Sequence, residues 1–76
     1  MSLLFPGQTL LVAPVDDPAD EQLAAVESVS QTGISLELEG VYGVGCVLSV
    51  GPLRVRVQFV ASVAVGRWRL DCEHVL

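Results

Sequence analysis

The stretch that decides the fold is LRVRVQFVASVAVGRWRLDC, residues 53–72, in which polar and apolar side chains alternate in two separate runs. A β-strand sends successive side chains to opposite faces, so each run predicts a strand with one polar and one apolar face. We place these strands at 53–60 and 65–72, with a turn between them at 61–64. The two strands then form an antiparallel hairpin.

All four positively charged residues of the chain lie in this hairpin, as Arg54, Arg56, Arg67 and Arg69. The turn placed above brings Arg56 opposite Arg69. All four arginines then point to one face, and Trp68 points to the opposite, apolar face, where it anchors the core. The hairpin therefore predicts a single arginine surface.

Two arginines side by side are unfavourable unless a negative group lies between them. Glu37 and Glu39, on the outer face of a neighbouring predicted strand, supply such a group within the chain itself. The alternative is an external anion, such as a phosphate, a nucleotide or an acidic segment of a partner, held by the guanidinium groups. The sequence leaves both interpretations open.

The rest of the chain also has the pattern of short strands separated by turn-forming residues. Residues 22–30 are ambiguous, because Asp17 and Pro18 are residues that often begin a helix, but no helical pattern continues beyond them, which favours a strand. The predicted strands cover residues 8–15, 22–30, 34–39, 46–50, 53–60 and 65–72. This pattern predicts one all-β domain over residues 1–76, a small six-stranded antiparallel barrel.

The chain is acidic, with a formal net charge of −5. Nucleic-acid binding is therefore not expected, because phosphate contacts need an excess of lysine and arginine. No apolar run reaches the roughly 18 residues of a membrane-spanning helix, and residues 1–5 lack the basic segment of a signal peptide. We expect a cytoplasmic protein without a membrane span. Because 51% of the residues are hydrophobic, a protein partner or self-association is expected.

The remaining polar residues predict no catalytic site. Cys46 and Cys72 lack the spacing of a zinc site, and we expect buried free thiols, with a disulfide only if their strands meet. The single histidine, His74, lies near the end of the sequence, where we expect a solvated side chain. No third group or oxyanion-hole motif accompanies Cys72 and His74. The sequence thus predicts no enzyme, no metal site and no cofactor.

The sequence resembles the PilZ superfamily in the order of its predicted strands and in three short segments, PGQ at 6–8, SVSQTG at 28–33 and RVRVQF at 54–59. The resemblance is greatest to the PilZ-like N-terminal domain of flagellar-brake proteins. PilZ proteins are bacterial six-stranded barrels that bind cyclic di-GMP, and Ser30 and Gly33 match their D/N-x-S-x-x-G turn.

The chain departs from the PilZ pattern at two places. Ser28 stands at the acidic or amide position of the turn, and no arginine precedes Arg54, so the RxxxR motif that grips the ligand is missing. The resemblance therefore implies a chain that does not bind cyclic di-GMP in the standard way by itself, and that acts through protein contacts.

Three functional hypotheses follow. The first is a non-enzymatic bacterial signalling or protein-interaction module of the PilZ-like type. The second is a receptor that binds cyclic di-GMP, a nucleotide second messenger, or another phosphate ligand on the arginine surface. The third is an SH3-like structural barrel that oligomerises. The predicted contact residues of the first two are Arg54, Arg56, Arg67 and Arg69.

Overall fold

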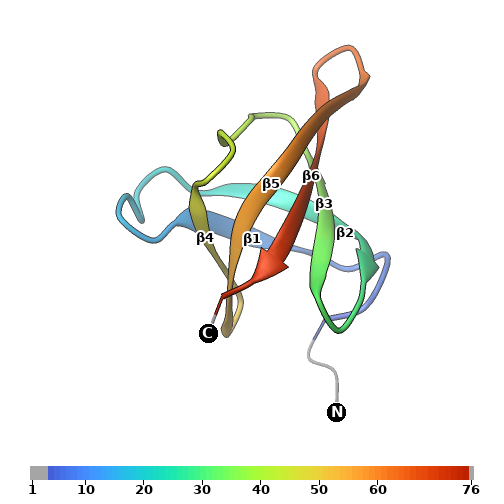
Figure 1. Cartoon of the computed structure of the whole chain (residues 1–76). Coiled ribbons are helices and arrows are strands. Elements are labelled where there is room, and N and C mark those ends of the chain that lie inside the picture. The colour runs from blue at the N-terminus through green and yellow to red at the C-terminus, as the bar shows by residue number, and fades with distance from the viewer. Residues whose placement is uncertain (1–3, 76) are drawn as a thin grey trace.

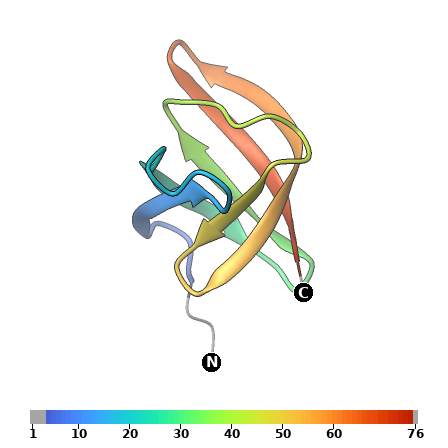
Figure 2. The same cartoon turned by 90° about the vertical axis from the view of Figure 1, so that its left-hand side faces the viewer.

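The chain folds into a closed antiparallel β-barrel of six strands, as the computed structural model shows for residues 4–75 (Figures 1 and 2). The strands are β1 (Thr9–Pro14), β2 (Gln22–Val29), β3 (Gly33–Leu38), β4 (Val47–Val50), β5 (Leu53–Ala64) and β6 (Arg67–His74). Their order around the barrel is β1-β2-β3-β6-β5-β4. Within the described residues, no helix has the length and apolar character needed to cross a membrane. The predicted all-β barrel is confirmed.

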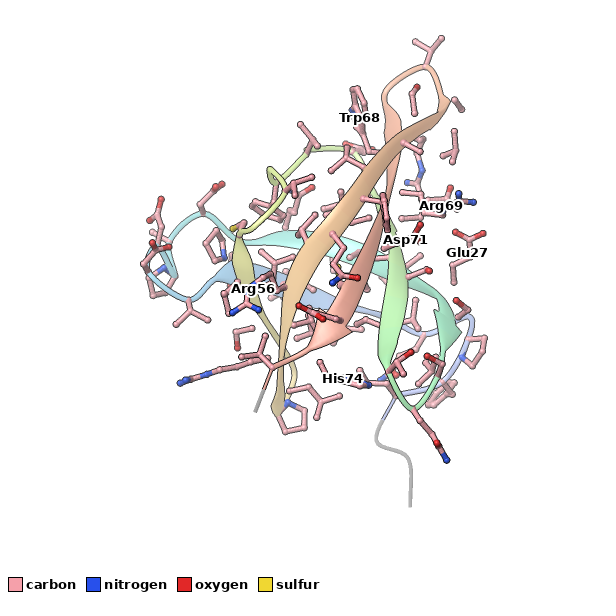
Figure 3. The ribbon with its side chains drawn as sticks, in the orientation of Figure 1. Glu27, Arg56, Trp68, Arg69, Asp71 and His74 are labelled. Carbon is pink, nitrogen blue, oxygen red and sulfur yellow. The ribbon has the colours of Figure 1, made fainter. Side chains whose placement is uncertain are left out.

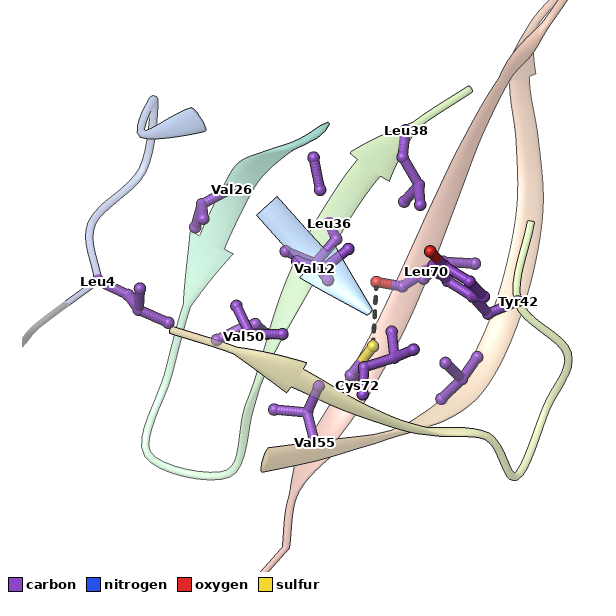
Figure 4. Close-up of a cluster of buried hydrophobic side chains, with 14 residues drawn as sticks. Leu4, Val12, Val26, Leu36, Leu38, Tyr42, Val50, Val55, Leu70 and Cys72 are labelled. Carbon is purple, nitrogen blue, oxygen red and sulfur yellow. Dashed lines mark hydrogen bonds between the residues drawn. The ribbon is translucent and has the colours of Figure 1, made fainter. Parts of the chain in front are cut away.

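The barrel encloses a core made by the apolar face of each strand. Alternate residues of a strand point to the same side, and those of β3 are Ile34, Leu36 and Leu38, all almost completely buried. Burial of a large apolar side chain contributes about 1.5–3 kcal/mol to stability. Figure 4 shows the core cluster, which consists of Leu4, Val12, Ala24, Val26, Ile34, Leu36, Leu38, Tyr42, Leu48, Val50, Val55, Val57, Leu70 and Cys72.

Two pairings between strands that are distant in the sequence close the barrel. β1 pairs with β4, with Val12 opposite Val50, and β3 pairs with β6, with Leu36 opposite Leu70. All four side chains are buried. The residues that close the barrel are therefore also residues of its core.

Residues 22–30, which are ambiguous in the sequence, form strand β2 and not a helix. Ala24 and Val26 are buried, whereas Leu23, the second residue of the strand, is exposed. After Val26 the register with β3 shifts at a β-bulge. The preference for a strand is confirmed, and the buried positions follow its two-residue period.

The predicted turn at 61–64 is wrong. β5 continues through it to Ala64, which pairs with Arg67, so the turn consists of Val65 and Gly66. Gly66 has a φ of +74°, a left-handed conformation that glycine adopts without the steric cost of a side chain. The chain has no glycine, proline, asparagine or aspartate between β5's arginines and this turn, which explains why the strand continues.

The later turn changes the pairing of β5 with β6. Arg56 lies opposite Glu73, and Arg69 lies opposite Ala61, so the predicted pairing of the two arginines is wrong. Like charges are thereby kept apart, and an arginine faces a glutamate across the two strands.

The aromatic residue of the core is also not the predicted one. Trp68 lies opposite Ser62 near the end of the hairpin, where its side chain is half-buried and outside the core cluster. Tyr42 belongs to the core instead, and its hydroxyl donates a hydrogen bond of 2.7 Å to the carbonyl oxygen of Asp20. This hydrogen bond ties the β3–β4 loop to the acidic β1–β2 loop.

Ser30 and Gly33, the residues of the predicted PilZ-like turn, shape the turn between β2 and β3. The Ser30 hydroxyl oxygen accepts hydrogen bonds from the backbone N–H groups of Thr32 (3.3 Å) and Gly33 (3.2 Å). Gly33 is buried, and a Cβ atom there would overlap the backbone carbonyl oxygen of Cys72. The close approach of β6 to this turn therefore requires glycine.

Replacing Gly33 by alanine tests this close approach. We expect Gly33→Ala to lower the free energy of unfolding by about 3 kcal/mol, because β3 or β6 must move to admit the Cβ atom. Gly43→Ala is the control: a Cβ atom at Gly43 has no neighbour within 4 Å, and the change should be less than about 0.5 kcal/mol. Urea denaturation measures both variants. Equal stabilities would contradict the close approach.

Candidate functional site

The end of the β5–β6 hairpin projects beyond the barrel (Figure 1). β4 has four residues against the twelve of β5, and β4 with the loop before it reaches β5 only as far as Val57. From Phe59 to Ala64, β5 pairs with β6 alone among residues 4–75. We call residues 59–64 the free edge of β5. Backbone N–H and C=O groups on its outer side have no partner strand within the described chain.

The exposed side chains of the hairpin are mostly apolar. Phe59 is 67% exposed, Val63 is 43% exposed, and Val65 at the tip is fully exposed. Residues 57–66 contain no ionisable side chain. An apolar strand edge that carries no lysine or proline is a template for pairing with another strand. The free edge therefore has the properties of a binding surface.

Two β-bulges border the regular part of the free edge. The register of β5 against β6 shifts around Gln58 and again around Val63, and such bulges bend and twist a strand locally. A shallow depression of about 260 Å³ lies at the base of the hairpin, where Phe59, Ser35 and Asp71 are among the lining residues. Phe59 of the free edge therefore also lines a hollow on the β6 side of β5, among polar side chains.

The arginines form two groups and not the predicted single surface (Figure 3). Glu73, which lies opposite Arg56, is four residues from Arg69 along β6, a separation of about 13 Å at roughly 3.3 Å per residue. Arg54 lies beyond Arg56 in one direction, and Arg67 lies beyond Arg69 in the other. The prediction of one arginine surface is therefore wrong.

Each group of arginines has a carboxylate partner within the chain. Arg56 Nη1 lies 3.2 Å from Glu73 Oε1, and Arg67 Nε lies 3.4 Å from Glu37 Oε1. Glu39, the other acid that the sequence offered as a partner, makes no ion pair with any residue in 4–75. The interpretation in which the chain's own acids neutralise its arginines is confirmed for Glu37.

Arg69 lies in a polar cluster on the outer face of β3 and β6. Its Nε is 3.6 Å from Asp71 Oδ1, which also accepts a hydrogen bond of 2.7 Å from the Ser35 hydroxyl. Arg54 makes no ion pair with a described residue, and it borders a separate groove of about 410 Å³ on β1 and β4. An anion that approached the other three arginines would compete with carboxylates already in place.

Substitutions that remove one charge test how much these ion pairs contribute to the stability of the fold. We expect Arg56→Gln to lower the free energy of unfolding by no more than about 1 kcal/mol, because both partners are largely exposed to water. Arg54→Gln is the control without an ion pair, and it should have no measurable effect. Urea denaturation at low and high salt measures both, and salt should remove the difference. A loss above about 2 kcal/mol for Arg56→Gln would mean that the pair is part of the fold's stability.

The two cysteines are free thiols with raised pKa values, as expected for partly or fully buried side chains. Burial, with a smaller effect of Asp71, raises the pKa of Cys72 to about 12. Burial also raises the pKa of Cys46. Both thiols are therefore held protonated at neutral pH, and a protonated thiol is a poor nucleophile.

His74 keeps a partly exposed side chain, in line with the expected contact with solvent. It belongs to β6, and its Nε2 lies 3.2 Å from the carbonyl oxygen of Ser30. No group of three histidine, cysteine, aspartate or glutamate side chains within residues 4–75 is arranged to hold a metal ion.

Thiol labelling tests the burial of Cys72. At neutral pH, we expect iodoacetamide to label Cys72 in the folded chain at least roughly a hundredfold more slowly than in urea, because the pKa of about 12 leaves almost no thiolate. The variant Cys46→Ser isolates this reaction, and mass spectrometry follows it. Equal labelling rates in the folded and unfolded chain would contradict the buried position.

The free edge is the part of the site that the sequence prediction missed. Its signal was present: residues 57–65 contain no glycine, proline, asparagine or aspartate, and Gly66 supplies the first position suited to a tight turn. A turn placed there gives the observed pairing of β5 with β6.

Comparison of the chain with protein families, curated proteins and solved structures finds no match. The resemblance to PilZ proteins therefore stays a prediction. The function has to be argued from the residues themselves.

Proposed function

We propose that the chain is a non-enzymatic protein-interaction module that binds its partner through the β5–β6 hairpin. The observation that carries the proposal is the free edge of β5, which is apolar, uncharged and held beyond the barrel. Its backbone groups supply hydrogen bonds to an added strand, and Phe59, Val63 and Val65 supply apolar contacts.

The remaining chemical groups support binding more than catalysis. The raised pKa values of Cys46 and Cys72 disfavour a thiolate nucleophile. Three of the four arginines are engaged with carboxylates. These ion pairs and the separation of the two groups also do not favour a cyclic di-GMP or phosphate receptor, which stays the alternative prediction.

The resemblance to PilZ proteins supplies the proposed setting, bacterial signalling in the cytoplasm. Of the predicted contact residues, Arg67 and Arg69 lie at the hairpin, opposite Ala64 and Ala61. In the proposed complex they would exchange part of their ion pairing for polar contacts next to the free edge, whereas Arg54 and Arg56 lie toward the other end of β5.

Site-specific photo-crosslinking tests the proposal. In one variant, a photoreactive amino acid replaces Val65, which is fully exposed at the hairpin tip. In a separate control variant, it replaces the exposed Gln31 in the β2–β3 turn. In cells of the native host, we expect protein adducts from position 65 and none from position 31, because position 65 lies at the exposed apolar tip of the hairpin, whereas position 31 lies in a polar turn.

Adducts are identified by mass spectrometry after purification under denaturing conditions. The absence of any protein adduct from position 65, or equal adducts from both positions, would contradict a binding role for the hairpin.

A further inference from the structure

We infer, resting on the proposed function, that the partner of the free edge is a second copy of this chain. The second copy adds its own β5 antiparallel to the first, across a two-fold axis near Ala61. The two β5–β6 hairpins then form one four-stranded sheet between the barrels, in the order β6-β5-β5-β6. Such an interface is isologous, because each copy contributes the same stretch of strand.

The side chains of the free edge fit a partner with the same sequence. With Ala61 next to Ala61 of the second copy, Phe59 of each chain lies beside Val63 of the other. Large exposed side chains thereby cover one another. Cross-strand pairs of an aromatic and a β-branched residue stabilise antiparallel sheets.

The distribution of charge favours contact at this edge. Two chains that each carry a net charge of −5 repel one another, but no ionisable residue lies within 57–66. In Figure 1 the acidic β1–β2 loop lies at the left of the barrel, whereas the hairpin tip projects at the upper right. The loop contains the acids Asp16, Asp17, Asp20 and Glu21. Two copies therefore meet with their most acidic segments far apart.

The barrel limits this assembly to two chains. The free edge is the longest stretch of strand in residues 4–75 that pairs on one side only. Pairing it with the same stretch of another copy uses it completely. A two-fold contact of this kind is closed and does not propagate into a fibre.

Charge-swap variants of the full chain test the inference. One variant carries Phe59→Lys and Val63→Lys, and the other carries Phe59→Glu and Val63→Glu. Since Phe59 and Val63 are exposed, each variant should keep the fold, as circular dichroism can check. The control variant, Leu11→Lys and Leu23→Lys, places the same charges on an exposed apolar pair of β1 and β2.

Sedimentation across a wide concentration range measures the association. We expect the wild type and the control to dimerise reversibly. Each charge-swap variant alone should have a dissociation constant at least roughly tenfold higher. An equimolar mixture of the two should re-form a dimer, because lysine then faces glutamate at both ends of the interface.

Three results would each overturn the inference: a wild type that is monomeric at every concentration, charge-swap variants that each dimerise alone as tightly as the wild type, or a mixture that associates no better than either variant alone. Failure of this inference can be distinguished from failure of the proposed function by the crosslinking experiment. If position 65 crosslinks to a different protein while the chain is monomeric, the hairpin is a binding site but not for a second copy. If position 65 gives no adduct of any protein, the proposed function itself fails.

Discussion

Closure of the barrel by the pairing of β1 with β4 is the constraint on which the rest of the structure depends. Val12 and Val50 lie opposite each other at this junction and are almost fully buried. β4 is so short that it pairs only with the first part of β5, residues 53–56, which is the lower half of the strand in Figure 1. The upper half of β5 contains the free edge, residues 59–64. The closure that protects every other long edge therefore leaves the upper half of β5 uncovered, because no strand of the described chain is available to pair with it.

The two faces of β5 and β6 then acquire different roles. Inside the barrel, residues such as Val55 and Leu70 supply the core. Outside, Arg56, Arg67 and Arg69 meet carboxylates on the same or a neighbouring strand, and these partly exposed pairs contribute little to stability. Beyond the barrel, residues 57–66 of the hairpin carry no ionisable side chain, and Phe59, Val63 and Val65 are exposed. A stretch with this composition is most stable when a partner covers it.

Much of the fold follows from the sequence alone, because the alternation of polar and apolar residues fixes which side of each strand is buried. The strand over 22–30 and the arginine strands could be found in this way. The pairing of β5 with β6 could not be found from alternation, because the prediction placed the turn at 61–64 and so set the register wrongly. Attention to Gly66 would have corrected it. The ion pair of Arg67 with Glu37 was foreseen as one alternative, whereas the free edge depends on where β4 ends, which alternation does not reveal.

Amide hydrogen exchange measured residue by residue at low protein concentration tests the central claim most directly. In an antiparallel strand, successive N–H groups point to opposite sides, so the account predicts rapid exchange for alternate amides of residues 59–64. The amides of 55–57, which lie between β6 on one side and β4 with the loop before it on the other, should be slow. Uniformly slow exchange along the whole of β5 in the dilute chain would show that its upper half is already covered, and would contradict the account.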